Sequence, residues 1–557
     1  MNKIVTILLV LLLAMPIYAA TVTFGMLTDI HTGDAEDAGG RYYSEVPTKV
    51  AAAVAQFVSD NVDYIINLGD SMDAYDDTTE LAAVVTQLNG NAGSIPVLWI
   101  IGNHDCYNAG FDKDDWMAAV GQTATYKYVD IGNLRVFALD CGYSSTGASW
   151  PTEYAYESSY IPKSKLNQLD TDLTAADAAG KFSIICSHQR LGTYGTTLDI
   201  INYQQLWDIM AEHKVIAAFS GHAHVAKHSN SLVSNSDGTD IKFFGLEAVV
   251  DGTSVNAYSV VSINDATGAI TITGYSNAYS HKETTWDNSD ADGDYANANN
   301  WSNGLPVSGD IAIFDAISNT VASANLDQSA IDLMELRVST GYTAAMGDAD
   351  YVYWSGTTVN MSGGFNTTKI STSCDYLRCY GLAGASKTIY LHSGSVIGTI
   401  NSAMPNTDWY ILSQGNVSGD YVITGGKVRQ VYMGTTCGDA IISGSSELEL
   451  RAQTTTPLIM GEITIISGLL DVANLAATTD KLTLEKLKIL GGTIALEDGT
   501  VTITDGIELY GTPTAFTHLN TQCWPVTVKS QKSCELTQTV AAYSGNFVTG
   551  GEVRRRP

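Results

Sequence analysis

The chain has few basic residues and few charged residues of any kind. Lysine and arginine together number 29 against 59 aspartate and glutamate residues, which gives a formal net charge of -30. This charge repels the phosphate backbone of long nucleic acids and excludes them as the main partner. A small anionic substrate is less restricted, because bound metal ions dominate the local field at a site. With 557 residues, 45% hydrophobic and 16% charged, the composition is typical of a globular, β-rich protein of several domains.

Long apolar runs are also scarce, and the single one lies at the N-terminus. Lys3 precedes the apolar residues 4–14, and the small residues at 17–20 follow them, which is the pattern of a secretory signal peptide. We therefore expect residues 1–20 to direct export to the periplasm or the extracellular space. An uncleaved membrane anchor is the alternative, although the apolar stretch is short for a span. We expect no integral membrane segment after signal removal, because no second long apolar run follows.

None of the eight cysteines belongs to a Cys-x-x-Cys motif, which disfavours a zinc ribbon or a redox motif. Disulfides are compatible with an exported protein. Cys374 with Cys379, and Cys523 with Cys534, have spacings that suit local bridges. Cys186 lies inside an apolar run, so we expect it to be a buried free thiol.

From residue 21 to residue 282, apolar strands alternate with amphipathic helices. The expected strands are Val22–Thr28, Tyr64–Leu68, Val97–Ile101, Leu134–Leu139, Phe182–Cys186, Val215–Phe219, Tyr258–Ile263 and Ile270–Tyr275. The two clearest helical faces contain Val50, Val54, Phe57 and Val58, and Leu81, Val84, Val85 and Leu88. This alternation predicts an α/β core in which helices cover the faces of the sheets.

The pattern changes near residue 283. Residues 283–305 are polar and turn-forming, as in a linker or the start of the next domain. From residue 306 to 557, short β-prone runs with glycine-containing turns recur at roughly 20–25 residues, without convincing helices. This spacing favours the stacked coils of a parallel β-solenoid, and a pair of β-sandwiches is the alternative.

Five short polar clusters follow predicted strands in the first half of the chain. They are Asp29-Ile30-His31, Gly69-Asp70, Gly102-Asn103-His104-Asp105, Ser187-His188 and Gly221-His222-Ala223-His224. Ligands in α/β sheets collect at the carboxyl ends of strands, so we expect these side chains to converge. Carboxylate, imidazole and amide groups without a thiol suit two divalent or trivalent metal ions, with Mn²⁺ favoured and Fe or Zn²⁺ as alternatives. The glycines are expected to allow tight turns that swing the next side chain into the site.

In this order, the clusters resemble the calcineurin-like metallophosphoesterase superfamily over residues 21–282. The resemblance implies a four-layer α/β sandwich, with two β-sheets flanked by helices and two metal ions side by side. The implied ligands of the first metal are Asp29, His31, Asp70 and His224, and Asp70 bridges to a second metal that Asn103, His188 and His222 also hold. A carboxylate bridge places two ions about 3.5–4 Å apart, which suits in-line attack of a metal-bridging hydroxide on phosphorus.

The family pattern also implies roles for His104 and Asp105. His104 is expected to protonate the leaving oxygen or steady the phosphoryl group, and Asp105 to orient and charge its ring. The alternative for Asp105 is a carboxylate that caps a turn. Arg41 is a candidate phosphate contact or a structural arginine, and His213 is expected to cap the C-terminus of a helix.

Residues 34–43 and 245–259 resemble the manganese-dependent ADP-ribose and CDP-alcohol diphosphatase subgroup, although members of that subgroup often carry Gln where this chain has His31. We therefore expect an exported dinuclear-metal phosphohydrolase with a small phosphorylated substrate, such as a phosphodiester or a nucleoside diphosphate compound. The alternative is a cell-surface or adhesive β-solenoid protein in which the phosphoesterase domain is secondary or a binding scaffold. Its β-region would then contact carbohydrate or a cell surface, with Tyr351, Tyr353 and Trp354 as candidate stacking residues unless they belong to the solenoid core.

Overall fold

The computed structural model describes most of the chain after residue 20, and the predicted signal peptide lies outside the described residues. The described residues are 21–74, 77–91, 93–154, 159–191, 199–225, 227–234, 236, 240–253, 257–275, 278–316, 324–325, 327–339, 342, 344, 352–361, 368–380, 388–391, 396–403, 410–413, 416–431, 437–451, 458–472, 481–496, 500–509, 515–517, 522–523 and 526–527. The chain divides into two compact units, residues 1–282 and 283–557. Within the described segments, no helix has the length and apolar character needed to cross a membrane.

The first unit contains two mixed β-sheets. One sheet has the order β11 (Ile270–Tyr275), β10 (Tyr258–Asn264), β1 (Thr21–Leu27), β2 (Tyr64–Asn67) and β3 (Val97–Trp99). The other has the order β4 (Lys127–Ile131), β5 (Leu134–Leu139), β6 (Phe182–Ser187), β7 (Val215–Ser220), β9 (Asp240–Gly245) and β8 (Lys227–Ser234). In the first sheet, β1, β2 and β3 are parallel, β10 is antiparallel to β1, and β11 is antiparallel to β10. In the second sheet, β5, β6, β7 and β9 are parallel, and the edge strands β4 and β8 are antiparallel to their neighbours.

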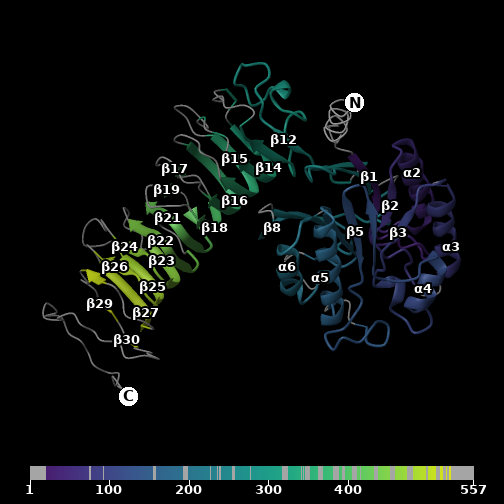
Figure 1. Ribbon diagram of the computed structural model, residues 1–557, viewed down its shortest axis with the longest axis horizontal. Coiled ribbons are helices and arrows are strands. Elements are labelled where there is room, and N and C mark those ends of the chain that lie inside the picture. Colours follow the sequence, from purple (N-terminus) through teal and green to yellow (C-terminus); the bar gives the residue numbers. More distant parts are fainter. Residues whose placement is uncertain are drawn as a thin grey trace, which may run out of the picture. The chain divides into compact units, whose positions relative to one another are not determined.

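Helices cover the outer face of each sheet (Figure 1). They are α2 (Val46–Ser59), α3 (Thr78–Thr86), α4 (Lys113–Val120), α5 (Lys163–Ala178) and α6 (Tyr203–Ala211), with short helices η1 (Tyr43–Glu45), η2 (Gln87–Asn91) and η3 (His104–Cys106). Phe57 of α2 and Trp116 of α4 share one buried cluster with Ile65 of β2, whereas Leu169 of α5 packs in another cluster with Phe137 of β5. The central strands are buried on both faces, as expected for parallel strands between two layers. The predicted layered α/β fold is confirmed.

All eight strands predicted in this unit are present, with ends within two residues of the predicted ones. The strands β4, β8 and β9 were not predicted, and β4 and β8 lie at the edges of the second sheet, where the apolar signal is weak. Val58 is 47% exposed although the helical pattern grouped it with Phe57. Successive residues of a helix are rotated by about 100° around its axis, so Val58 lies at the margin of the apolar stripe that contains Phe57.

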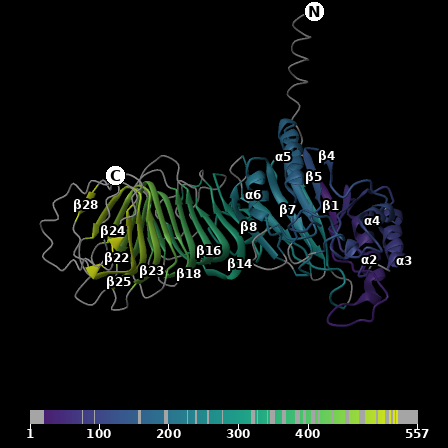
Figure 2. The ribbon, with the colours of Figure 1, turned by 90° about the horizontal axis from the view of Figure 1, so that it is seen from below.

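The second unit is a stack of parallel strands (Figure 2). The strands are β12 (Glu283–Thr285), β13 (Ile311–Phe314), β14 (Asp327–Val338), β15 (Val352–Met361), β16 (Thr368–Tyr380), β17 (Thr388–Leu391), β18 (Val396–Ala403), β19 (Tyr410–Ser413), β20 (Asn416–Val417), β21 (Tyr421–Val431), β22 (Ala440–Arg451), β23 (Leu458–Ile465), β24 (Leu469–Val472), β25 (Lys481–Ile489), β26 (Thr493–Leu496), β27 (Thr500–Leu509), β28 (Ala515–Thr517), β29 (Gln522–Cys523) and β30 (Val526–Thr527). Ala440 pairs with Ile463, and Ile463 pairs in turn with Leu487, which are steps of 23 and 24 residues. These steps match the predicted repeat, and parallel pairing is the arrangement that stacked coils require.

Residues 283–305 form the structured start of this second unit rather than a linker. They contain β12 and the short helix η5 (Ala298–Asn300). The rings of Trp286 and Trp301 are buried with centroids 5.3 Å apart. The amide of Asn297 donates to Asp290 Oδ2 at 2.9 Å, which ties the polar turn residues to one another.

The predicted bridge between Cys374 and Cys379 is wrong, because both cysteines are buried and neither forms a disulfide. They lie on one extended strand, β16, where five residues span about 16 Å and side chains point to opposite faces. Cys186 is a buried free thiol, as predicted. Cys534 and the side chains of the three aromatic residues at 351, 353 and 354 lie outside the described part of the chain.

Candidate metal centre

The seven predicted metal ligands converge at the carboxyl ends of five parallel strands. Asp29 and His31 follow β1, and Asp70 follows β2. Asn103 follows β3, His188 follows β6, and His222 and His224 follow β7. The strand order of the two sheets therefore explains why residues up to 195 positions apart share one site.

The ligand atoms form two adjacent groups. Asp29, His31 and His224 each place one such atom within 4.8 Å of the others, and so do Asp70, His188 and His222. The Asn103 Oδ1 atom lies 3.1 Å from His188 Nε2, next to the second group. Asp70 Oδ2 lies 3.0 Å from His188 Nε2 and 3.7 Å from His31 Nε2, so this carboxylate stands between the groups.

Three of the imidazoles are held from outside through Nδ1. His31 donates to Asp73 Oδ1 at 2.9 Å, and His224 donates to Asp251 Oδ2 at 3.1 Å. His188 donates to the carbonyl of Leu68 at 3.0 Å. Each contact fixes the tautomer and turns Nε2 toward the cluster, as in the carboxylate–histidine pairs that support metal ions. Asp73 and Asp251 were not predicted.

The surroundings of one carboxylate oxygen, Asp29 Oδ1, indicate whether these residues suit a metal ion. Asp29 Oδ1 is buried and accepts no hydrogen bond from any described residue. It lies 3.4 Å from His224 Nε2, 3.8 Å from His31 Nε2 and 3.9 Å from His188 Nε2. The other oxygen, Oδ2, accepts from the Thr28 hydroxyl at 2.7 Å and from the His222 N–H at 2.9 Å. A buried carboxylate oxygen that faces three imidazole nitrogens fits a divalent cation with nitrogen and oxygen ligands.

The backbone at the site is strained. Asp29, Asp70 and three histidines have positive φ values, which are 49° for Asp29, 46° for His31, 53° for Asp70, 67° for His222 and 60° for His224. This left-handed region costs energy for residues other than glycine, and such residues gather at functional sites. The strain is a consequence of aiming ligands from consecutive short turns at one point.

The three glycines beside the ligands act in two different ways. Gly69 has a φ of 104°, so it gives the predicted freedom of turning. A Cβ at Gly102 would lie 2.1 Å from Asp70 Oδ1, and one at Gly221 would lie 2.5 Å from Asp29 Oδ2. Neither Gly102 nor Gly221 has a positive φ, so their backbone conformation does not require glycine. They are needed because the missing side chain lets the carboxylates approach closely.

Electrostatics make the cluster strongly attractive to cations. Burial acts to raise the pKa of Asp70, but the nearby charges of His188 and His104 outweigh it and hold the pKa well below the usual range. Burial acts to lower the pKa of His31, but the nearby carboxylates of Asp29 and Asp73 raise it to about 9. Burial and the charge of His188 lower the pKa of His222 to about 3. The Asp70 carboxylate is thus kept ionised, which favours the binding of a metal cation.

His104 and Asp105 are neighbours in sequence, but their side chains make different contacts. His104 Nδ1 lies 2.6 Å from the carbonyl oxygen of Asp73, and the His104 ring is 4.5 Å from that of His31. Asp105 accepts from the N–H groups of Ser71 at 2.8 Å and Gly102 at 2.9 Å. The predicted contact of Asp105 with the His104 ring is therefore wrong, and the turn-capping alternative is correct.

Two further residues were given candidate roles from the sequence, His213 and Arg41. His213 does not cap a helix, because its ring joins Asp177 Oδ2 at 2.7 Å and Asp170 Oδ1 at 2.9 Å, both on α5. Arg41 donates to Asp73 Oδ1 at 3.4 Å and is about one third exposed, next to the metal-ligand cluster.

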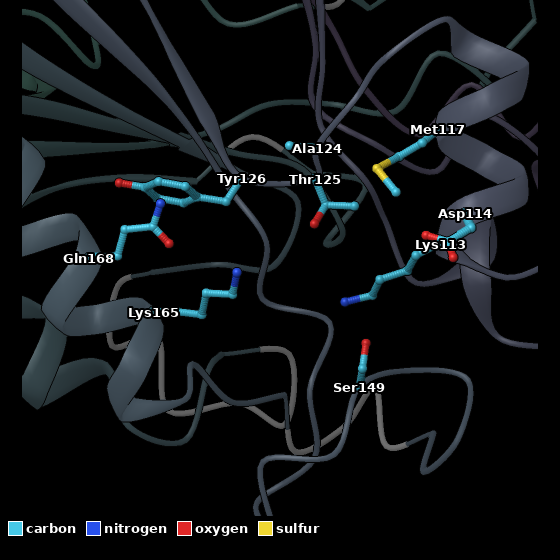
Figure 3. A pocket seen from close by; sticks show the side chains of 9 residues that line it. All are labelled: Lys113, Asp114, Met117, Ala124, Thr125, Tyr126, Ser149, Lys165 and Gln168. Carbon is cyan, nitrogen blue, oxygen red and sulfur yellow. The ribbon is translucent and has the colours of Figure 1, made fainter.

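A cavity of about 390 Å³ lies elsewhere in this unit, between α4, α5 and residues 124–126, which precede β4 (Figure 3). It contains none of the predicted ligands, and its lining includes Lys113, Thr125 and Tyr126. These three polar groups are already engaged, because Lys113 and Thr125 both donate to Asp140 and Tyr126 donates to Asp172.

The sequence of this unit matches a known family. Residues 22–226 match the profile of the calcineurin-like phosphoesterases, and this segment includes every predicted ligand together with His104 and Asp105. No curated protein matches the chain in sequence.

Several solved structures are similar to this chain at low sequence identity. A dimetal phosphatase from Danio rerio is 19% identical over 46% of this chain and 98% of that chain, with a TM-score of 0.40. A purple acid phosphatase from yellow lupin (Lupinus luteus) seeds is 13% identical over 47% of this chain and 53% of that chain, with a TM-score of 0.34. The NAD nucleotidase of Haemophilus influenzae is 13% identical over 48% of this chain and 50% of that chain, with a TM-score of 0.32.

The family match and the ligand geometry concern the same residues. The two groups of carboxylates and imidazoles lie where five parallel strands end, within the matched segment. Residues 22–226 form a calcineurin-like phosphoesterase domain, and this domain has the features of a metal-dependent phosphoesterase.

Proposed function

We propose that the chain is an exported dinuclear-metal phosphohydrolase that cleaves phosphodiester or nucleoside-diphosphate-type substrates. The observation that carries this proposal is the pair of ligand groups around Asp29 and Asp70, with the Asp70 carboxylate between them. When bound there, two metal ions would supply charge neutralisation and an activated nucleophile for phosphoryl transfer. The pattern of residues 1–20 supports export.

We assign proton transfer at the leaving group to His104. Its Nδ1 faces the carbonyl oxygen of Asp73, which can only accept, so Nδ1 carries the proton and Nε2 is the atom that exchanges one with substrate. The backbone N–H of His104 donates to Asp70 Oδ1 at 2.8 Å, which fixes the ring relative to the bridging carboxylate. With its side chain 30% exposed, His104 is accessible from solvent where the other histidines of the cluster are more buried.

Aromatic side chains beside His104 support a leaving group with a ring, such as a nucleoside. The ring of Tyr107 lies 5.9 Å from that of His104, and Tyr154 follows at 5.8 Å from Tyr107. The amide of Asn103 donates to the Tyr154 hydroxyl at 3.4 Å, so the aromatic group reaches a predicted metal ligand. Stacking of one base on such a ring is worth about 1–3 kcal/mol.

We propose Mn²⁺ as the metal, with Fe or Zn²⁺ as alternatives. The candidate ligands are oxygen and imidazole nitrogen atoms, which suit these ions. The nearest cysteine in sequence, Cys106, donates to the carbonyl of Gly102, and burial raises the pKa of its thiol. A thiolate ligand from Cys106 is therefore disfavoured.

For the stack of parallel strands we propose a role in contact with carbohydrate or a cell surface. The continuous sheet of parallel strands supports this role, because stacked repeats present extended binding surfaces. Retention of the full chain on cell-wall polysaccharide columns tests this role. Elution with the void volume on every column would contradict it.

A substrate panel with Mn²⁺ tests the proposed reaction. The panel contains bis-p-nitrophenyl phosphate, p-nitrophenyl phosphate, a cyclic nucleotide, ADP-ribose and CDP-choline, each assayed with the wild type and His104→Ala. We expect turnover of at least one diester or nucleoside diphosphate compound. A preference for ADP-ribose or CDP-choline would support a relation to the ADP-ribose and CDP-alcohol diphosphatase subgroup. Activity on the monoester alone would contradict the proposal.

A further inference from the structure

A buried lysine in the first unit has no role in the chemistry described so far. Lys49 lies on the buried face of α2 and is only 1% exposed. Its ammonium group points at the backbone of residues 249–252, which we call the Asp251 loop. The Nζ atom lies near four successive carbonyl oxygens, 3.0 Å from that of Val249, 3.2 Å from Val250, 3.2 Å from Asp251 and 2.8 Å from Gly252.

The four carbonyls form a cage that suits a cation. An ammonium group has three donors and no acceptor, so its burial requires several acceptors in convergent positions. Successive carbonyls of an extended chain point in alternating directions, so a loop whose four oxygens face one atom must curl around it. The Asp251 loop therefore curls around the Lys49 ammonium.

The same loop touches the metal centre through its other groups. The N–H of Val249 donates to the Thr28 carbonyl at 3.0 Å, and that of Val250 donates to the Asp29 carbonyl at 3.2 Å. The Asp251 carboxylate accepts from His224 Nδ1 at 3.1 Å. The loop thus joins the end of β1, which carries a ligand, to the imidazole of another ligand in the same group.

We propose that Lys49 is a positioning residue for the metal centre, because it holds the Asp251 loop in the curve that places the Asp251 carboxylate against His224. The proposal rests on the metal centre of the proposed function. Loss of the ammonium group lets the loop relax, the carboxylate moves from Nδ1, and His224 loses the contact that aims Nε2 at Asp29 Oδ1. Supporting carboxylates of this kind change metal affinity by about 10–100-fold.

Titration of the full chain with Mn²⁺ tests this role in four proteins: the wild type, Lys49→Met, Asp251→Asn and the double variant. Bound and free Mn²⁺ are separated by their electron paramagnetic resonance signals. We expect each single variant to bind one of the two ions at least about 10-fold more weakly than the wild type does. The double variant should be no weaker than Asp251→Asn, because both changes act through His224.

The alternative is that Lys49 only stabilises the fold. In that case, Lys49→Met lowers the melting temperature of the metal-free chain but binds both ions as the wild type does, and this result would overturn the proposal. Additive losses in the double variant would overturn it too. Absence of Mn²⁺ binding by the wild type would contradict the proposed function rather than this inference.

A second variant keeps the test open if Lys49→Met does not fold. Lys49→Gln retains two N–H donors for the cage and removes the charge. We expect its affinity for the weakened ion to lie between those of the wild type and Asp251→Asn. Wild-type affinity in a folded Lys49→Gln protein that melts at a lower temperature would contradict the positioning role.

Discussion

His31 donates from Nδ1 to Asp73 Oδ1 at 2.9 Å, and this contact turns the Nε2 atom of His31 toward Asp29 and Asp70. We predict that Asp73→Asn weakens Mn²⁺ binding about 10–100-fold, because the imidazole loses the carboxylate that orients it. Isothermal titration calorimetry measures this change. Asp34→Asn is the matched control, since Asp34 is an exposed carboxylate near His31 in sequence. Equal affinity of Asp73→Asn and Asp34→Asn would contradict the orienting role.

His104→Ala is predicted to lower kcat by about 10²–10⁴-fold, the usual contribution of general acid catalysis. Metal content should stay near two ions per chain, because His104 donates only its backbone N–H to Asp70. The loss should be smaller for p-nitrophenyl esters than for alkyl esters, since p-nitrophenolate leaves without a proton. An equal loss for both leaving groups would argue against proton donation by His104.

Gly102→Ala is predicted to disrupt the metal centre without unfolding the domain. The added methyl group would lie 2.1 Å from Asp70 Oδ1, so the bridging carboxylate must move. We expect the variant to bind Mn²⁺ at least about 10-fold more weakly. Gly90→Ala is the control, because the nearest atom to its new methyl group is 3.9 Å away, an ordinary contact. Similar Mn²⁺ affinities for the two variants would contradict the close-approach role of Gly102.

The buried pair of Lys113 and Asp140 predicts a dependence of stability on pH. Burial acts to raise the pKa of Asp140, but the Lys113 ammonium at 2.7 Å and the Thr125 hydroxyl outweigh it and lower the pKa. A lowered folded-state pKa gives stability that is present above the unfolded value, about 3.9, and lost as pH falls through the folded value.

Asp140→Asn is therefore predicted to lower the free energy of unfolding at pH 7 by about 3–5 kcal/mol, because Lys113 remains buried without its charge partner. Urea unfolding at pH 7 and at pH 3 measures the effect, and the difference from wild type should shrink at the lower pH. Asp130→Asn is the control, since the carboxylate that pairs with Arg135 is 38% exposed and such pairs contribute about 1 kcal/mol or less. A difference from wild type that grows toward pH 3 would contradict the assigned sign.

Much of the site could be predicted from sequence because its ligands follow apolar strands directly. Asp29, Asp70 and His188 each stand one to three residues after a strand, so the strand pattern also locates the ligands. The supporting residues carry no such signal. Asp73 is 42 residues from His31 in sequence and Asp251 is 27 residues from His224, and these distances depend on loops rather than on a helical or strand period.

The prediction for Asp105 failed for a related reason. Asp105 is adjacent to His104 in sequence, but consecutive side chains of the short helix η3 point in different directions. The Asp105 carboxylate turns inward to backbone N–H groups, whereas the His104 ring turns toward Asp73. Neighbours in sequence are a poor guide to contact in such turns. The parallel pairing of the second unit, in contrast, was readable from its repeat, because stacked strands recur at a constant spacing.

The number of metal ions per chain tests the central claim most directly. Metal-free protein is equilibrated with excess Mn²⁺, desalted and analysed by inductively coupled plasma mass spectrometry, for the wild type and for Asp70→Asn. Two ions per chain in the wild type and a clear loss in Asp70→Asn, whose carboxylate lies between the two ligand groups, are the predicted result. No retained metal in an active wild-type enzyme, or full retention in Asp70→Asn, would contradict the dinuclear centre.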